Sequence, residues 1–527
     1  MRFQPLKISI EVYSVIFMLC TLLFFNSVFF EKIYQESNLI FTIGTFIVLW
    51  PLGTVACLLL FYKKSVKPLS FLFLITNASV FYFVKNYNVF IDDEMLRNAL
   101  QTNLAETGEL LNLTWFLYIL FFGILPSILI CFIRIDHRLA LRNRIFLIFV
   151  CILVPVSLIF ANFQTVAPFV RSHKHLKYQL IPVNYIGAIS SFIKKYYRQN
   201  HKFQFIGQDA HFEQYWSNDK KNLIVFVVGE AARADKFSFN GYERKTNAPL
   251  EKFTDDIINF SNVTSCGTST AVSLPCMFSK DERENFVSGS MEYTENLLDI
   301  VQRSGYNVTW VENNSDCKNL CTRINTLYPC SIHPQDHDCL DDVLLPEIDL
   351  AMPEFAQNTM IVLHQIGSHG PKYFKRYKKE DMQYEPVCAT EMLNECSKEQ
   401  LVNVYDNTIY YTSKILAEII EKIQKFSQDY NVMLFYISDH GESLGENNIY
   451  LHSAPYTFAP KEQKKVPFFI WAEAKTLDEL NLDKDCLLKE AQKAVSQDNV
   501  FHSLLSIGGI KTQEYKKELD LFAKCKK

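Results

Sequence analysis

Polar side chains that could bind a metal ion follow two apolar, strand-like runs beyond residue 220 of this 527-residue chain. Asp439 and His440 come directly after Val432–Ile437, and Glu230 follows Leu223–Val228. Taken alone, Glu230 would more often be the cap of a following helix. An Asp-His pair, however, is costly to bury unless it binds something. Two carboxylates and an imidazole suit zinc, so the combination favours a zinc site.

Three further histidines could lie near this site. His364 and His369 follow the apolar run Met360–Leu363, and His452 comes twelve residues after His440. Two histidines within six residues could also form a satisfied polar turn. His452 could instead belong to a neighbouring site.

The segment 265–276 is rich in small hydroxyl residues between two cysteines, Cys266 and Cys276. Such residues would begin a helix, whose N-terminal amides favour phosphate, and a disulfide across the segment would hold it rigid. A hydroxyl held against a metal ion has a lowered pKa and becomes an alkoxide-like nucleophile. The alternative is a plain helix N-cap with spare hydroxyls.

The residues described above belong to a pattern of short apolar runs and longer helical stretches that begins after Lys221. This alternation is typical of an α/β fold. A fourth predicted strand covers Val308–Val311. In open parallel sheets, ligands bind beyond the carboxyl ends of the strands. The candidate residues all lie at such ends, so the predicted sheet would bring them together.

The first 165 residues are mostly apolar and predict a membrane domain. The whole chain is 49 % hydrophobic, with 43 Phe, which is unusual for a soluble enzyme. A transmembrane helix needs about 20 apolar residues. We place five near residues 10–30, 39–62, 69–84, 112–133 and 145–163. The third is short and contains Asn77. No small-residue cleavage site follows the first, so we expect a retained helix rather than a signal peptide.

Basic residues around these spans predict their orientation, because cytoplasmic loops are enriched in Lys and Arg. The basic positions are 2 and 7 before the first span, 63, 64 and 67 after the second, and 134, 138, 142 and 144 after the fourth. The connections 31–38 and 85–110 are acidic or mixed. They therefore lie outside, and everything after residue 165 lies in the periplasm.

Cysteine spacing supports an oxidising compartment. Ten of the 14 cysteines follow the apolar region, and eight of these form pairs close in sequence. The close pairs are Cys266 with Cys276, Cys317 with Cys321, Cys330 with Cys339, and Cys388 with Cys396. Disulfides explain such pairs better than zinc ribbons do, since only one pair has a roughly finger-like spacing. The sequence leaves open whether Cys486 and Cys525 pair.

These observations predict three regions: a transmembrane domain at 1–165, a linker at 166–220 and a periplasmic catalytic domain at 221–527. In the linker, Ile186–Ile193 precedes a basic stretch and could lie along the membrane surface, although a plain linker fits as well. The net charge of −4 and the lack of a basic run argue against a nucleic-acid partner.

Together the four site segments resemble the phosphoethanolamine transferases that modify lipid A, including the transferable colistin-resistance enzymes. The resemblance runs from the five-helix N-terminus almost to the end of the chain. It is most specific in Ser265–Ser279, His364–Tyr377 and Ser438–His452. It implies a membrane domain of five transmembrane helices followed by an α/β domain of the alkaline phosphatase and sulfatase type.

The resemblance also implies a nucleophile and a metal. Thr270, four residues after Cys266, corresponds to the nucleophile of the family. The cofactor implied is one tightly bound zinc ion, with a second zinc ion left open. The zinc ligands correspond to Glu230, Thr270, Asp439 and His440.

Other residues correspond to substrate-binding positions. His369 and His452 match histidines that exchange protons and bind the substrate phosphate or a second zinc ion, and His364 matches another histidine of the site. Ser315 and Lys318 match positions assigned to phosphate or substrate.

In the third connection, Asn98 and Thr102 match polar contacts to the lipid headgroup, and Glu106 matches a nearby acidic position. The family disulfides fit Cys266–Cys276, Cys330–Cys339 and Cys388–Cys396, whereas a pair at Cys317–Cys321 occurs in only some members.

The function implied is transfer of phosphoethanolamine from phosphatidylethanolamine to lipid A through a phospho-threonine, giving resistance to polymyxins. We expect a monomeric, multi-pass protein of the bacterial inner membrane, with lipopolysaccharide as its acceptor. Alternatives are transfer to a core sugar, glycan or protein, a related phosphoglycerol transferase, a hydrolase, or a non-catalytic envelope receptor. Sulfatases of this fold need a Cys or Ser that is converted to formylglycine, and Thr270 argues against that chemistry.

Overall fold

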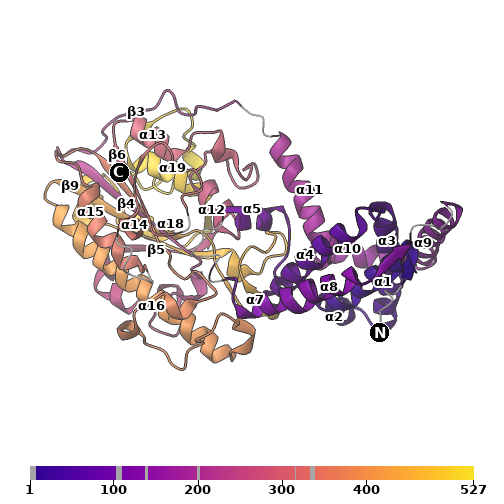
Figure 1. Ribbon diagram of the computed structural model, residues 1–527. Coiled ribbons are helices and arrows are strands. Elements are labelled where there is room, and N and C mark those ends of the chain that lie inside the picture. Colours follow the sequence, from indigo (N-terminus) through magenta and orange to yellow (C-terminus); the bar gives the residue numbers. More distant parts are fainter. Residues whose placement is uncertain are drawn as a thin grey trace. The chain divides into compact units, whose positions relative to one another are not determined.

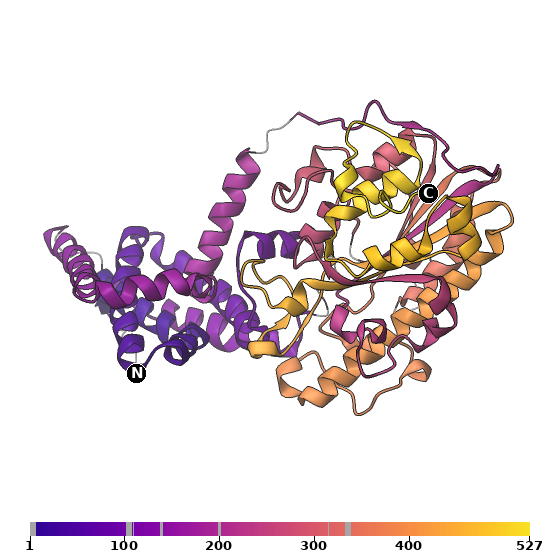
Figure 2. The ribbon, with the colours of Figure 1, turned by 180° about the vertical axis from the view of Figure 1, so that it is seen from behind.

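The computed structural model describes residues 7–101, 108, 110–136, 141–198, 202–314, 316–332 and 339–527. Its ribbon is shown from two sides in Figure 1 and Figure 2. The chain forms two compact units. The membrane unit comprises Met1–Leu96 and Leu110–Ile193, and the catalytic unit comprises Arg97–Glu109 and Lys194–Lys527. The limits of a linker at 166–220 remain a proposal.

Four helices in the described part of the chain are long and apolar enough to cross a membrane. A fifth crossing is formed if the bent pair α1 and α2, which meet at 68°, counts as one span. The third predicted span, 69–84, is the middle of a longer helix. The elements are α1 (Ile10–Phe25), α2 (Ser27–Glu36), α3 (Leu39–Leu60), α4 (Val66–Tyr87), α7 (Leu113–Tyr118), the π-helical η1 (Ile119–Ile124), α8 (Leu125–Cys131) and α9 (Leu141–Ala161).

Two buried asparagines inside this unit form hydrogen bonds with residues far away in sequence. The break between α1 and α2 lies at Asn26, whose amide donates to the carbonyl of Ile181 at 2.9 Å while its oxygen accepts from the Ile181 amide at 2.8 Å. In α4, Asn77 accepts from the Tyr185 hydroxyl at 2.9 Å. Both asparagines are buried, so neither exposes its side chain to lipid.

Shorter elements complete the membrane unit. β1 pairs with β2 in parallel, and Lys7 bridges Asp136 at 2.9 Å. The exposed apolar residues Val183, Ile186, Ile189 and Ile193 form one stripe along α11. This stripe supports the proposal that 186–193 lies along the membrane surface. The elements are β1 (Lys7–Ser9), β2 (Arg134–Asp136), α5 (Asp93–Gln101), which ends in the catalytic unit, α10 (Phe163–Ser172), the 3₁₀ turn η2 (Lys174–Gln179) and α11 (Val183–Arg198).

An eight-stranded sheet of order β13-β5-β12-β9-β4-β8-β6-β7 forms the centre of the catalytic unit. The strands from β9 to β7 are parallel, and β12 runs antiparallel to both of its neighbours. The strands of this unit are β3 (His211–Phe212), β4 (Lys221–Gly229), β5 (Ile257–Thr264), β6 (Asn307–Glu312), β7 (Asn325–Leu327), β8 (Thr359–His364), β9 (Tyr430–Ser438), β10 (Ser443–Leu444), β11 (Tyr450–Leu451), β12 (Lys465–Trp471), β13 (Val495–Ser496) and β14 (Ile510–Lys511).

Helices cover both faces of this sheet, so its central strands are apolar throughout. In β4, Phe226 and Val228 face one core together with α12, α13 and α19, whereas Val225 and Val227 face a second core with α15 and α16. The two helical layers lie on opposite sides of the sheet in Figure 1. The helices are α12 (Thr270–Met277), α13 (Leu297–Arg303), α14 (Pro329–Ile332), α15 (Leu344–Ala351), α16 (Lys398–Ile423), α17 (Ala474–Glu479), α18 (Lys484–Glu490) and α19 (Asp498–Ile507).

The four strands predicted from the sequence are the four adjacent strands β9, β4, β8 and β6. Their carboxyl ends therefore meet at one edge of the sheet, as expected. The remaining strands of the sheet, β5, β7, β12 and β13, were not predicted.

Candidate metal and phosphate site

Two strand ends and one helix start supply the site. Gly229 and Ser438 are paired in the parallel register of β4 and β9. Glu230 and Asp439, the residues that follow them, therefore lie side by side. Thr270 is the first residue of α12. These elements bring the two carboxylates, His440 and the Thr270 hydroxyl to the same edge of the sheet.

The four side chains are in direct contact and are almost completely buried. The Thr270 hydroxyl donates to Glu230 Oε2 at 3.1 Å and lies 3.3 Å from His440 Nε2. His440 Nε2 in turn lies 3.3 Å from Glu230 Oε1 and 3.4 Å from Asp439 Oδ2. One ligand atom each from Glu230, Asp439 and His440 fall within 4.8 Å of one another.

This cluster fits a bound cation because its electron pairs face one another. His440 Nδ1 lies 2.8 Å from the Gly441 carbonyl and donates to it, which leaves the lone pair of a neutral ring on Nε2. Glu230 Oε1 and Asp439 Oδ2 are buried, and neither has a hydrogen-bond donor among the described residues. Two carboxylate oxygens and an imidazole nitrogen that converge without protons between them form a zinc-type ligand set.

The electrostatics of the cluster agree with that conclusion. Burial and the charge of Glu230 raise the pKa of Asp439 to about 6. Burial alone would lower the pKa of His440, but the charges of Asp439 and Glu230 raise it to about 10. Without a metal the cluster therefore gains a proton on His440, and a bound cation would replace that proton.

His452 and His369 lie beside this cluster. The ring of His452 is 4.3 Å from that of His440 and 5.7 Å from that of His369. His452 Nδ1 lies 3.3 Å from Glu442 Oε1 and 3.4 Å from Oε2, so this fully buried carboxylate fixes the ring orientation. Glu442 was missed by the sequence reasoning, although it lies only two residues after His440.

His364 is connected to the cluster through Asn314 rather than by direct contact. Its Nδ1 lies 3.0 Å from both oxygens of Glu312, and its Nε2 lies 3.3 Å from the Asn314 amide. That amide also donates to Glu230 Oε2 at 2.8 Å. Glu312 and Asn314 were not among the predicted residues. Glu312 is the last residue of β6, and Asn314 lies two residues after it. β6 is the one predicted strand that was not expected to supply a metal ligand or a histidine.

Gln497 supports the site through backbone hydrogen bonds, and it too was not predicted from the sequence. Its oxygen accepts from the Cys266 amide at 2.7 Å, and its amide donates to the carbonyls of Ser438 at 2.8 Å and Asp439 at 2.7 Å. It therefore connects the turn before α12 with the end of β9. A Cβ on Gly267 would lie 2.9 Å from the Val272 side chain, so this turn needs glycine to pack against the first turn of α12.

The segment from the third connection, which the sequence related to the lipid headgroup, also belongs to the catalytic unit. Arg97 is buried and its Nη1 lies 3.1 Å from Glu292 Oε1. Lys318 is buried as well and donates to the Gln101 carbonyl at 3.4 Å. Asn98 follows Arg97 in α5. Thr102, Glu106 and Ser315 lie outside the described residues.

Five disulfides join cysteines of the catalytic unit. They are Cys266–Cys276, Cys317–Cys321, Cys330–Cys339, Cys388–Cys396 and Cys486–Cys525. The first four are the close pairs seen in the sequence, and the fifth settles the question left open there. Cys266 and Cys276 also lie near Asp498, but sulfurs joined to each other are not metal ligands.

Comparison with known proteins shows the class of enzyme. Residues 222–510 match the sulfatase family, and residues 49–197 match the family described as phosphoethanolamine transferase EptA/EptB. The fold and the site thus define a sulfatase-type catalytic unit combined with the membrane domain of a transferase.

Individual relatives cover nearly the whole chain. Phosphoethanolamine transferase EptA of Escherichia coli K12 is 37 % identical over 473 residues, which is 88 % of this chain and 86 % of that protein. Phosphatidylethanolamine transferase Mcr-1 of Escherichia coli is 38 % identical over 479 residues, or 86 % of this chain and 87 % of Mcr-1. The structure of lipooligosaccharide phosphoethanolamine transferase A from Neisseria meningitidis superimposes with a TM-score of 0.95 at 33 % identity, covering 99 % of this chain and all of that one.

The chain therefore belongs to the phosphoethanolamine transferase family. It is an integral membrane enzyme whose catalytic unit lies in the periplasm, as the basic residues and cysteines predicted. The resemblance, the fold class and the transferase activity expected from the sequence are confirmed. The roles of individual site residues remain proposals.

Proposed function

We propose that this enzyme transfers phosphoethanolamine from phosphatidylethanolamine to lipid A by double displacement, with Thr270 as the nucleophile. The observation that carries the proposal is the position of the Thr270 hydroxyl. It lies 3.1 Å from Glu230 Oε2 and 3.3 Å from His440 Nε2, beside two carboxylate oxygens that lack donors among the described residues. The hydroxyls of Ser265, Thr268 and Ser273 in the same segment bond other atoms.

Glu230, Thr270, Asp439 and His440 would hold one zinc ion. When bound, zinc would lower the pKa of the Thr270 hydroxyl and neutralise charge on the substrate phosphate. The donor set fits this metal because it combines one imidazole with hard carboxylate oxygens. Metal analysis of the purified protein would show whether a second zinc ion binds beside His369 and His452.

In the first half-reaction, the Thr270 hydroxyl proton moves to Glu230 Oε2, the oxygen to which it already donates. Thr270 Oγ1 forms a bond to phosphorus, and the bond between phosphorus and the glycerol oxygen breaks. That oxygen takes a proton and leaves as diacylglycerol. His452 suits the donor role because Glu442 holds its Nδ1 and leaves Nε2 for the proton.

In the second half-reaction, an acceptor oxygen attacks the phosphorus of phosphoethanolamine-threonine. The bond between Thr270 Oγ1 and phosphorus breaks, and Thr270 regains its proton. His452 or His369 would accept the proton of the acceptor hydroxyl. Amides at the start of α12 would stabilise charge on the equatorial oxygens.

Lipid A is favoured as acceptor because the matching proteins include a lipooligosaccharide transferase and because the membrane unit confines the enzyme to the bilayer that holds both lipids. Such confinement raises the effective concentration of both lipids. Modification of lipid A by a cationic group would give polymyxin resistance. We further propose a monomer, since one chain supplies every ligand of the site.

The proposal is tested by mass spectrometry of lipid A from a Gram-negative host that expresses this chain or its Thr270→Ala variant. The expected result is a phosphoethanolamine increment with the wild-type chain alone. An increment with Thr270→Ala as well would refute the covalent mechanism. A phosphoethanolamine increment on core sugars or on protein would show that the acceptor is not lipid A. A phosphoglycerol increment would show that the donor is not phosphatidylethanolamine.

A further inference from the structure

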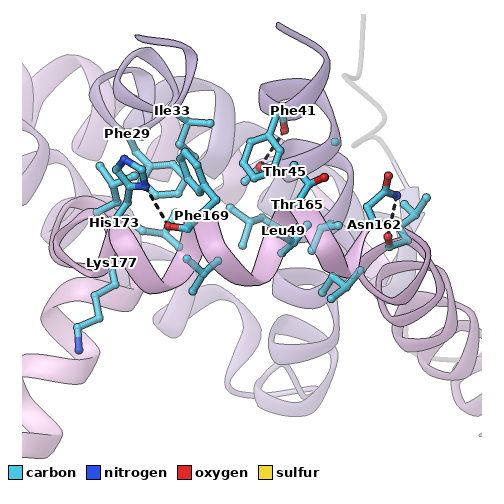
Figure 3. Close-up of a pocket in the computed structure, with 18 of the residues that line it drawn as sticks. Phe29, Ile33, Phe41, Thr45, Leu49, Asn162, Thr165, Phe169, His173 and Lys177 are labelled. Carbon is cyan, nitrogen blue, oxygen red and sulfur yellow. Dashed lines mark hydrogen bonds between the residues drawn. The ribbon is translucent and has the colours of Figure 1, made fainter. Parts of the chain in front are cut away.

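The membrane unit contains a cavity of about 610 Å³ between α2, α3, α9, α10 and η2. Its wall is mainly apolar and includes Phe29, Ile33, Leu49 and Phe169. Figure 3 shows the rings of Phe29, Phe41 and Phe169 gathered along it. Phe169 packs on Phe41, with ring centroids 4.5 Å apart. None of these residues belongs to the proposed catalytic site, so the cavity has no assigned function.

The residues that line the cavity place it within one leaflet of the membrane. The lining residues of α3, from Ile40 to Leu49, lie in the first half of that helix, and those of α9, Leu158 and Ile159, lie at its end. The connection before α3 and the chain after α9 are both periplasmic. The cavity is therefore at the depth of the periplasmic leaflet, where acyl chains are the surrounding solvent.

One side of the cavity is polar and positively charged. Lys174 and Lys177 of η2 are exposed at its edge, and in the described part of the chain neither ammonium has a carboxylate partner. The Lys177 side chain points away from the apolar interior in Figure 3, as expected of a lysine that reaches toward headgroups. No acid is among the described residues that line the cavity, and Glu36 lies 3.5 Å from the lining residue His173.

We propose that this cavity binds an anionic glycerophospholipid of the periplasmic leaflet. One acyl chain would occupy the apolar interior, and the lipid phosphate would lie at Lys174 and Lys177. The volume is within the range of small-molecule sites. The two lysines supply the charge complementarity that a pocket for a neutral chain would not need. This lipid binding is separate from the transfer reaction, so a test of it does not depend on the proposed function.

Gly44 allows the cavity to be filled without disturbing the helix. It lines the cavity, and a Cβ at this position would meet no atom within 4 Å. Gly44→Leu should therefore place its side chain in the apolar interior. Gly187 is the matched control, because a Cβ there also meets nothing within 4 Å and the residue does not line the cavity. Both substitutions add the same side chain to the same unit.

The lysines are tested by Lys174→Gln/Lys177→Gln, with Lys398→Gln/Lys425→Gln as a control that removes the same charge from exposed positions of α16 and the turn after it. The assay is native mass spectrometry of full-length chain in detergent, titrated with phosphatidylglycerol or with phosphatidylcholine of the same acyl chains. Each lysine near an anionic lipid is expected to favour binding by roughly fivefold.

The expected result is one tightly held phosphatidylglycerol that is lost in Gly44→Leu and kept in Gly187→Leu. The Lys174/Lys177 variant should bind it at least about fivefold more weakly, and the control lysine variant should bind it normally. Equal binding of the two lipids by the wild-type chain would overturn the proposal. So would retention of the lipid in Gly44→Leu, or a dimer of the chain that Gly44→Leu abolishes, since a second copy would then be the occupant.

Discussion

Replacing Glu312 by glutamine tests how much the buried pair between Glu312 and His364 stabilises the catalytic unit. Both carboxylate oxygens lie 3.0 Å from His364 Nδ1. The indole of Trp310 donates to Oε2 at 2.8 Å, and the backbone N–H of Asn314 donates to Oε1 at 2.7 Å. Glutamine has almost the same shape, but it carries no charge and its NH₂ group would face one of these three donors.

The magnitude follows from the burial of the pair. The Glu312 and His364 side chains are 4 % and 0 % exposed, so solvent does not screen their interaction. A hydrogen bond to a charged group contributes about 1.5–3 kcal/mol, and breaking a buried pair outright costs about 3–5 kcal/mol. Because glutamine keeps one acceptor, we expect a loss of about 2 kcal/mol. In a unit of this size the unfolding entropy is large, so this loss lowers the Tm by only about 3 °C.

The loss should depend on pH. Burial alone would raise the pKa of Glu312, but the charge of His364 holds it below its usual 4.5. Burial alone would lower the pKa of His364, but the charge of Glu312 holds it above its usual 6.5. The acid contributes stability above 4.5 that is lost as pH falls through its folded pKa, and the histidine contributes stability below 6.5 that is lost as pH rises through its folded pKa. The difference between wild type and Glu312→Gln should therefore be largest near pH 4.5–6.5.

The assay is thermal unfolding of the full-length chain in detergent, followed by tryptophan fluorescence at about pH 5.5, inside the window of largest difference, and at about pH 9, above it. Glu421→Gln is the control, because Glu421 forms an exposed pair with Lys252 that should contribute about 0–1 kcal/mol. A Tm loss in Glu312→Gln that is the same at both pH values, or no larger than in the control, would refute the argument.

Three other predictions concern the site. Thr270→Ala should stay folded and keep zinc by metal analysis, yet lose transfer activity by more than about 10³-fold in a lipid assay; loss of folding together with activity would contradict this. Asp439→Asn should lose zinc itself, because an amide oxygen is a weaker ligand than a carboxylate, and full zinc content would show that Asp439 is not a ligand. Glu442→Gln should keep zinc and lower kcat about 10–100-fold through misorientation of His452, with KM little changed; a normal kcat would remove Glu442 from the mechanism.

The sequence predicted those parts of the site that are contiguous with a strand end. Glu230, Asp439 and His440 each follow a buried apolar run, and parallel register then brings them together. Gln497 could not be predicted in this way. It bonds to the Cys266 amide across 231 residues of sequence, and its own neighbourhood has no pattern that distinguishes it from any surface glutamine.

The fold shows the same division between local and distant causes. Strands buried on both faces are continuous apolar runs and are visible in the sequence. β5 was missed because polar residues interrupt it, as in Asn259, Ser261 and Asn262. The bend of the first membrane span was also missed, because Asn26 is satisfied by Ile181, 155 residues away, and nothing near Asn26 indicates that partner.

The assignment of Arg97–Glu109 to the catalytic unit has a practical consequence for inhibitor discovery. A soluble fragment that starts after residue 200 would lack this segment. Glu292 would then lose the guanidinium of Arg97, and Lys318 would lose the Gln101 carbonyl. In such a truncated protein, the surface around Glu292 and Lys318 would be open to compounds, whereas the intact enzyme contacts it with its own chain. Compounds found by screening the fragment at this surface would therefore fail against bacteria.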